Sequence, residues 1–260
     1  QRLQMATQEG ENVAVYAVRG NFDDAQTGVK RVFADKEIAA RLAERNIRLS
    51  SANSINWGRL VPQIVYYFAA YGQLVRGGKI HFGDEVDFCV PTGNFGDILA
   101  GYYAKRMGLP VGRLVCASNK NNVLTDFLET GTYTAKREFY KTSSPSMDIL
   151  VSSNLERLLC HVTGSDAEVA FLMRQLSEQG SYTVRPETLA AIQESFACGW
   201  ASEEEVAAEI RARYEQNGYL CDTHTAVAFH VAVRQQRAGV PMVVLSTASP
   251  FKFPRSVLAA

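Results

Sequence analysis

The chain has 260 residues, of which 47% are hydrophobic and 21% are charged, so it can bury a large core as one large domain or two smaller ones. Its 27 Lys and Arg residues equal its 27 Asp and Glu residues, and this zero formal charge excludes a strong long-range field for nucleic acid or an anionic membrane. No apolar run approaches the roughly 20 residues that span a bilayer, so we expect neither a nucleic-acid partner nor a membrane.

The first third of the chain predicts one β-α unit followed by a long apolar helix. The β-branched run at 12–18 predicts a strand, and two aspartates can cap a helix over 23–39. A short strand is predicted at 47–49. Residues 60–75 are apolar around much of the helix circumference, which is typical of a helix packed inside a larger body.

The middle of the chain predicts a parallel sheet. A buried strand at 87–90, a glycine-bearing turn, a helix at 98–107 and a strand at 111–117 follow one another within about 30 residues. This order is the βαβ signature of an α/β fold. We expect the strands at 87–90 and 242–245 to belong to one largely parallel sheet and to converge on a shared cleft.

The rest of the chain predicts mainly helices. Residues 131–146 are expected to be irregular, and Ser152 or Ser153 is expected to cap the helix that follows. The predicted helices cover residues 122–130, 154–162, 165–178, 187–197, 202–217 and 223–238.

The cysteines give information on the compartment. The chain has five of them, without a CxxC pair or the paired spacing of a zinc site or a disulfide framework. We therefore expect free thiols in a reducing, cytoplasmic compartment, and no metal site. The residues are Cys89, Cys116, Cys160, Cys198 and Cys221.

The sharpest local feature is the turn Pro-Thr-Gly-Asn-Phe-Gly-Asp at 91–97. Gly93 and Gly96 let successive backbone N–H groups turn toward one point, and the helix N-terminus that follows adds a partial positive charge. Such a turn can hold an anion without a lysine or an arginine. The alternative is a tight turn in which Asp97 merely caps the helix, and the pattern alone leaves both open.

Two further segments are candidates for ligand contacts. At 51–59, short Ser and Asn side chains precede Arg59, whose planar guanidinium suits two phosphate oxygens. The alternative is helix capping by Asn56 and a surface salt bridge of Arg59. The Ser/Thr run at 246–249 follows a strand, where open α/β sheets place their ligands, although such a run often only satisfies the backbone of a turn.

Taken together and in this order, five motifs resemble threonine synthase of the longer bacterial and fungal type. They are NSINWGR at 53–59, PTGNFGD at 91–97, SNKNNVL followed by TGTY within 118–133, SPSMDI at 144–149 and LSTASPFKFP at 245–254. That family consists of fold-type II enzymes that depend on pyridoxal 5′-phosphate (PLP). The resemblance therefore implies a tryptophan-synthase-β-like, three-layer α/β/α fold with a mostly parallel sheet. It further implies that residues 1–50 are the remainder of a smaller domain and residues 51–260 the large PLP-binding domain.

The resemblance also implies roles for individual residues. Backbone amides at 93–96 are expected to hold the PLP phosphate, and one hydroxyl is expected to face the pyridine nitrogen. The cofactor-binding positions are matched by Gly93, Asn94, Phe95, Gly96, Asp97 and Thr247. The positions that hold the phosphate of the substrate are matched by Asn53, Ser54 and Arg59.

The implied activity is that of a carbon–oxygen lyase in threonine biosynthesis, which converts O-phosphohomoserine and water into L-threonine and phosphate as a monomer or homodimer. The alternatives are a phospho-lyase that releases a 2-keto acid, and a non-catalytic α/β domain that binds a phosphate ligand. The FKD-like motif with the Schiff-base lysine of the family and an SGDTG-like loop are missing from the sequence. We expect both to precede Gln1 and a further stretch to follow Ala260, so the segment alone would be inactive.

Overall fold

The computed structural model describes residues 7–19 and 22–260. They form two compact units, one that ends at residue 52 and one that begins at residue 53. The first unit contains helices α2 (Phe22–Ala34) and α3 (Lys36–Ala43). The assignment of residues 1–50 and 51–260 to two domains of an enzyme stays a prediction.

The first unit corrects three expectations. Residues 12–18 form no strand: their only pairing is an isolated bridge between Gly10 and Val13, because the described residues offer this run no partner strand. The helix expected over 23–39 is split, since Asp35 is extended and its carboxylate accepts from the first N–H groups of α3. Residues 47–49 are irregular rather than a strand.

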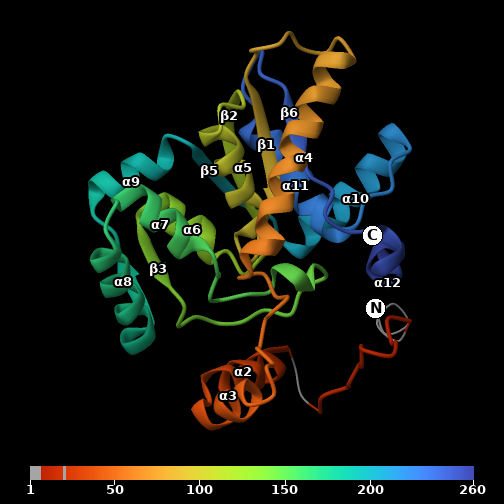
Figure 1. Cartoon of the computed structure of the whole chain (residues 1–260). Helices are drawn as coiled ribbons and strands as arrows, with labels where there is room; N and C mark the ends of the chain where they lie inside the picture. The colour runs from red at the N-terminus through yellow and green to blue at the C-terminus, as the bar shows by residue number, and fades with distance from the viewer. Residues whose placement is uncertain (1–6, 20–21) are drawn as a thin grey trace. The chain divides into compact units, whose positions relative to one another are not determined.

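The second unit is built on a parallel sheet with the strand order β5-β2-β1-β6 (Figure 1). The strands are β1 (Val86–Pro91), β2 (Val111–Ser118), β5 (Phe196–Trp200) and β6 (Met242–Val244). Phe88 of β1 lies opposite Leu114 on one side and Val243 on the other. The prediction that the strands near 87–90 and 242–245 share one parallel sheet is confirmed.

Strand β5 corrects the sequence prediction, which extended a helix over 187–197. Helix α9 (Pro186–Gln193) ends earlier, and β5 then pairs with β2 through Phe196 opposite Leu114. A short apolar run can be helix or strand by its pattern, and here pairing with β2 decides. Residues 131–146 also contain a strand, β3 (Thr132–Thr134), which pairs antiparallel with β4 (Ser181–Thr183).

Helices cover both faces of the sheet, as the three-layer prediction requires (Figure 1). On β1, Phe88 faces the core formed with α4, α5 and α6, whereas Cys89 faces the core formed with α10, α11 and α12. Burial on both faces explains why β1 is apolar apart from Asp87, whose buried carboxylate pairs with Arg237. The helices of this unit besides α9 are α4 (Trp57–Arg76), α5 (Gly96–Arg106), α6 (Val123–Thr130), α7 (Leu155–Thr163), α8 (Asp166–Gln179), α10 (Glu203–Asn217), α11 (Thr223–Gln235) and α12 (Pro254–Ala259), with 3₁₀ turns at Pro145–Met147 and Pro250–Lys252.

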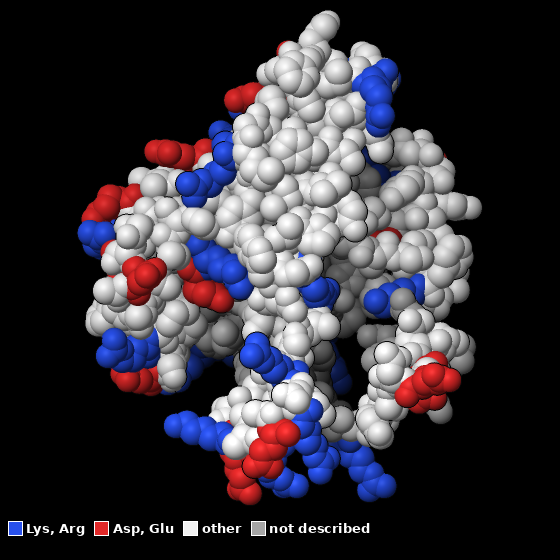
Figure 2. Space-filling model, viewed as in Figure 1, with Lys and Arg blue, Asp and Glu red and all other residues white. Residues whose placement is uncertain are grey.

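Helix α4 is buried on one side only. Leu60, Tyr67 and Tyr71 face the core, while Val65 and Tyr66 are 62% and 63% exposed. Figure 2 shows a largely uncharged surface over this helix. Among the described residues, the packing that the sequence predicts for α4 is therefore observed on only one face of the helix. Within the residues that the structure describes, no helix is long and apolar enough to cross a membrane.

Candidate functional site

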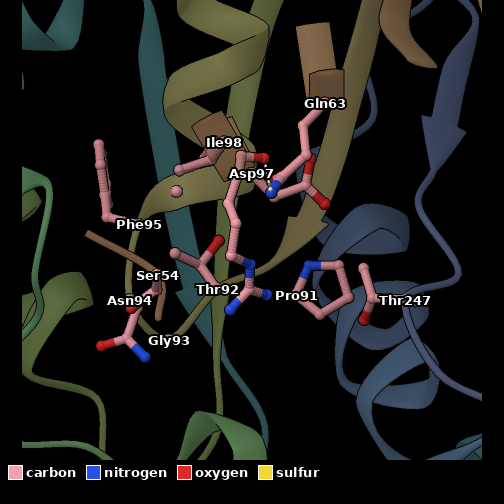
Figure 3. Close-up of a pocket in the computed structure, with 12 residues that line it drawn as sticks. Ser54, Gln63, Pro91, Thr92, Gly93, Asn94, Phe95, Asp97, Ile98 and Thr247 are labelled. Carbon is pink, nitrogen blue, oxygen red and sulfur yellow. Dashed lines mark hydrogen bonds between the residues drawn. The ribbon is translucent and has the colours of Figure 1, made fainter. Parts of the chain in front are cut away.

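A cavity of about 190 Å³ opens where the segments at the carboxyl ends of β1 and β6 meet the start of α4 (Figure 3). Figure 3 shows Ser54 and Asn94 on one side of it and Thr247, close to Pro91, on the other. Polar side chains and backbone from segments far apart in the sequence therefore meet at one place. The lining residues are Ser54, Arg59, Gln63, Pro91, Thr92, Gly93, Asn94, Phe95, Gly96, Asp97, Ile98 and Thr247.

The cavity brings together eight of the nine residues singled out from the sequence. The exception is Asn53, whose side-chain oxygen instead accepts from the N–H of Ile55 at 3.3 Å. Gly93 and Thr247 line the same cavity, so the expected convergence of the segments after β1 and β6 on one cleft is observed. Gln63 and Thr92 also line it and were missed. Gln63 could have been found, because it lies one helical turn after Arg59 and donates to its carbonyl oxygen at 2.8 Å.

The turn between β1 and α5 is shaped differently from the expectation. Phe95, rather than a glycine, has the left-handed conformation, with φ 58° and ψ 2°. Its ring is 1% exposed and packs 5.7 Å from the ring of Phe196, which compensates for a backbone geometry that non-glycine residues seldom adopt. Gly93 is required for another reason: a Cβ atom there would lie 2.7 Å from the carbonyl oxygen of Ser146.

Backbone donors gather at this turn. Within the described part of the chain, the N–H groups of residues 93–98 donate to no carbonyl or side chain, whereas the N–H of Leu99 already donates to Phe95. Unpaired N–H groups at a helix N-terminus, together with the helix dipole, favour an anion. The turn therefore has the chemistry of a phosphate site, and its donors are part of the wall of the cavity.

Asp97 does not cap α5, contrary to the alternative considered from the sequence, because no side chain makes a capping hydrogen bond at this helix. Its carboxylate instead accepts from the hydroxyl of Tyr67 at 3.2 Å, and its backbone carbonyl accepts from the same hydroxyl at 2.8 Å. Burial raises the pKa of Asp97 to about 6, although the Tyr67 hydrogen bond acts in the opposite direction. The carboxyl group can thus be neutral at mildly acidic pH, when it least opposes an anion.

The segment before α4 contributes the positive charge of the cavity. Capping by Asn56, which the sequence offered as the alternative to ligand binding, is observed, since its side-chain oxygen accepts from the N–H of Gly58 at 2.7 Å. The cap starts the helix at Trp57, which places Arg59 in its first turn and on the cavity wall. A guanidinium there can bind two oxygens of a phosphate group.

The segment after β6 contributes a hydroxyl. Thr247 follows Ser246, whose Oγ lies within hydrogen-bond distance of Thr225 Oγ1, at 3.1 Å, and Thr225 donates its hydroxyl proton to the buried carboxylate of Asp222. This chain of hydrogen bonds fixes the backbone beside Thr247. Across residues 7–19 and 22–260, no group of three or more His, Cys, Asp or Glu side chains could hold a metal ion.

Comparison with known proteins points to one family. Residues 225–260 match the family model for the C-terminal region of threonine synthase. The chain is 45% identical over its whole length to threonine synthase-like 1 of Macaca fascicularis, and 43% identical over 99% of its length to threonine synthase of Pseudomonas aeruginosa. Among solved structures, the PLP-bound threonine synthase of Brucella melitensis matches 93% of the chain with a TM-score of 0.84 and 46% identity.

These matches, with the three-layer fold and the cavity at the carboxyl ends of its strands, define the class: the fold is that of the fold-type II PLP enzymes. Within that class, the chain is similar to threonine synthase over essentially its whole length. It spans 53% of the Pseudomonas protein, 50% of the Brucella chain and 35% of threonine synthase-like 1.

Proposed function

We propose that the chain provides the phosphate-binding part of a PLP-dependent enzyme that converts O-phosphohomoserine and water into L-threonine and phosphate. The observation that carries this proposal is that residues 93–98, whose N–H groups have no partner among the residues that the structure describes, line one cavity with Arg59 and Thr247. One anion at the backbone turn and a second at Arg59 would fit a cofactor phosphate and a substrate phosphate.

Each residue then has a defined task. The N–H groups from Gly93 to Gly96 would hold the phosphate of PLP, and Thr247 would present its hydroxyl to the pyridine nitrogen. A neutral hydroxyl partner leaves that nitrogen largely unprotonated, unlike a carboxylate. When bound, PLP supplies an electron sink for the charge left by removal of a proton next to the amino group.

Ser54 and Arg59 would hold the phosphate of the substrate while its bond to carbon breaks. Negative charge grows on that phosphate as it leaves, so a guanidinium aimed at it stabilises the transition state more than the ground state. Asn53, which lies off the cavity wall, would act through the backbone of Ser54 and Ile55. No residue of this chain is assigned as the proton carrier.

The test is product analysis with the full-length gene product that contains these residues. After incubation with O-phosphohomoserine and PLP, we expect threonine and inorganic phosphate in equal amounts, measured by chromatography and a phosphate assay. A 2-keto acid in place of threonine would instead establish a phospho-lyase. This second function is kept because threonine synthase-like 1 matches the chain as well as the enzymes named threonine synthase do. Binding of both ligands without any product would establish a non-catalytic phosphate-binding domain.

A further inference from the structure

The segment before and at the start of α7 holds both of the turns to which phosphates are assigned above. We call residues 152–157 the clamp segment. None of them lines the cavity, but four of them make hydrogen bonds to the two turns. Ser152, Ser153, Asn154 and Arg157 are the four residues.

Asn154 is the centre of the clamp segment. Its side chain donates to the carbonyl oxygen of Asn94 at 2.9 Å and to that of Ser54 at 3.0 Å. The residue is fully buried and has φ 72°, so a left-handed backbone places its amide between the two turns. A buried amide that joins two loops about 60 and 100 positions away in sequence is well suited to fix their separation.

Arg157 fixes Asn154 in turn. Its Nε donates to the side-chain oxygen of Asn154 at 3.1 Å, which sets the orientation of the amide so that the NH₂ group faces both carbonyl oxygens. The other end of the guanidinium donates to the carbonyl oxygen of Ile55 at 2.9 Å. The turn at 53–59 is therefore held at two successive carbonyls, those of Ser54 and Ile55.

The direction of the phosphate-binding N–H groups follows from these contacts. Ser152 Oγ donates to the carbonyl oxygen of Gly93 at 2.7 Å, and Asn154 holds that of Asn94. In a planar trans peptide, the N–H points opposite to the C=O. With both carbonyls pulled toward the clamp segment, the N–H groups of Asn94 and Phe95 must point away from it.

We propose that Asn154, oriented by Arg157, is a positioning residue that sets the direction of the N–H groups in the 93–96 turn. It also sets the distance between that turn and the 53–59 turn, so that the two phosphates bind at the correct separation. This inference rests on the proposed function, because it takes each turn to bind a phosphate. A purely structural role for Asn154 predicts lower stability without a joint effect on the two turns.

The test variant is Asn154→Asp, which keeps the size of the side chain, the acceptor for Arg157 and the tolerance for a left-handed backbone. It removes the NH₂ group and places a carboxylate against two carbonyl oxygens. Asn46→Asp is the chemical control, since Asn46 also has a left-handed φ, 55°, and belongs to the other compact unit. Leu172→Ala is the stability control, because Leu172 is buried in α8, away from both turns.

Hydrogen exchange followed by mass spectrometry provides the first readout and needs no ligand. In Asn154→Asp we expect faster exchange at the amides of 53–59 together with those of Thr92 and Leu99, the hydrogen-bonded amides on either side of residues 93–98, and no change at these peptides in Asn46→Asp or Leu172→Ala. Faster exchange in one turn alone, or in neither, would overturn the proposal, as would the same pattern in Leu172→Ala.

Calorimetric titration provides the second readout, with two probes. The first is 4′-deoxypyridoxine 5′-phosphate, which keeps the ring nitrogen and the phosphate but cannot react with lysines. The second is inorganic phosphate added to the protein saturated with the first. We expect Asn154→Asp to weaken both by about tenfold or more, equivalent to about 1.4 kcal/mol each. Unchanged binding of either probe would contradict the proposal that Asn154 positions both turns. If the wild-type chain binds neither probe, the phosphate assignments fail, and the exchange experiment alone decides whether the clamp exists.

Discussion

The two turns that meet at the cavity are held in different ways. The turn at 91–97 continues directly from β1, and Pro91, Thr92 and Phe95 are buried. The turn at 53–59 belongs to no sheet, and Trp57 in it is 48% exposed. It is held by its own helix cap and by side chains from the clamp segment. The first turn thus continues a core strand and receives further hydrogen bonds from residues about 60 positions later, whereas the second has no strand beside it and depends on residues about 100 positions later.

The largest effect is expected at the second turn, from Arg59→Ala in the full-length enzyme. Loss of a charge-assisted contact to a partly desolvated phosphate should cost about 2–5 kcal/mol, or roughly 30- to several-thousand-fold in kcat/KM. PLP should stay bound, because its phosphate is assigned to backbone amides. Steady-state kinetics and a PLP absorbance titration measure the two effects separately.

Two controls sharpen this prediction. Arg59→Lys should recover only part of the rate, since lysine keeps the charge but loses the planar two-point contact. Arg76→Ala, at the other end of the same helix, should leave kcat/KM unchanged. If Arg59→Ala loses PLP while remaining folded, the two phosphates have been assigned to the wrong turns.

In the first turn, one added methyl group tests whether close packing fixes the backbone. Gly93→Ala places a Cβ 2.7 Å from the backbone oxygen of Ser146, so we expect a loss of about 1–3 kcal/mol of stability and of binding of 4′-deoxypyridoxine 5′-phosphate. Gly96→Ala is the matched variant, because its Cβ would meet nothing closer than 3.6 Å. Urea unfolding should show the stability of Gly96→Ala close to that of wild type. Equal effects in both would mean that close packing at Gly93 does not set the turn.

The pH dependence of stability should report on Asp97. Its folded pKa of about 6 lies above the ordinary 3.8, so between these values the unfolded state releases a proton that the folded state keeps. Stability contributed by this group is therefore full below pH 3.8 and falls as the pH rises through about 6. Asp97→Asn should gain on wild type by about 1–2 kcal/mol between pH 4 and pH 7, after allowance for partial exposure. Parallel stability curves for the two proteins would contradict the raised pKa.

The smallest effect is expected from the helix cap of the second turn. Asn56→Ala removes the acceptor for the N–H of Gly58 and should cost about 1 kcal/mol of stability. Because Arg59 lies in the turn so capped, the affinity for inorganic phosphate should fall severalfold as well. Ser165→Ala removes the equivalent cap of α8 and should cost similar stability with unchanged phosphate affinity. If both variants keep full affinity, the cap does not position Arg59.

The sequence predicted the features that depend on neighbouring residues. Two short, mainly apolar segments on either side of a glycine-bearing turn and a helix were sufficient for β1, α5 and β2, and the resemblance to threonine synthase extended them to the three-layer fold. Strand β5 was missed because five residues of mixed pattern take their conformation from pairing with β2.

In the candidate site too, the sequence predicted the features that depend on neighbouring residues and missed those that depend on distant contacts. Eight of the cavity-lining positions were predicted by motif, whereas Gln63, the left-handed conformation of Phe95 and the clamp segment were not. Phe95 depends on packing against Phe196, and Asn154 acts through hydrogen bonds to Asn94 and Ser54. Contacts between residues so far apart leave no periodic signal along the chain.

The strand order has a consequence for synthesis on the ribosome. Strand β6 pairs with β1 through Met242 opposite Asp87, so β1 and the turn at 91–97 emerge long before the strand that covers the edge of β1. Until then, β1 is a mainly apolar edge strand with unpaired backbone groups, which other chains can join. A nascent or truncated chain that stops before Pro241 should therefore aggregate, and it would also lack Thr247.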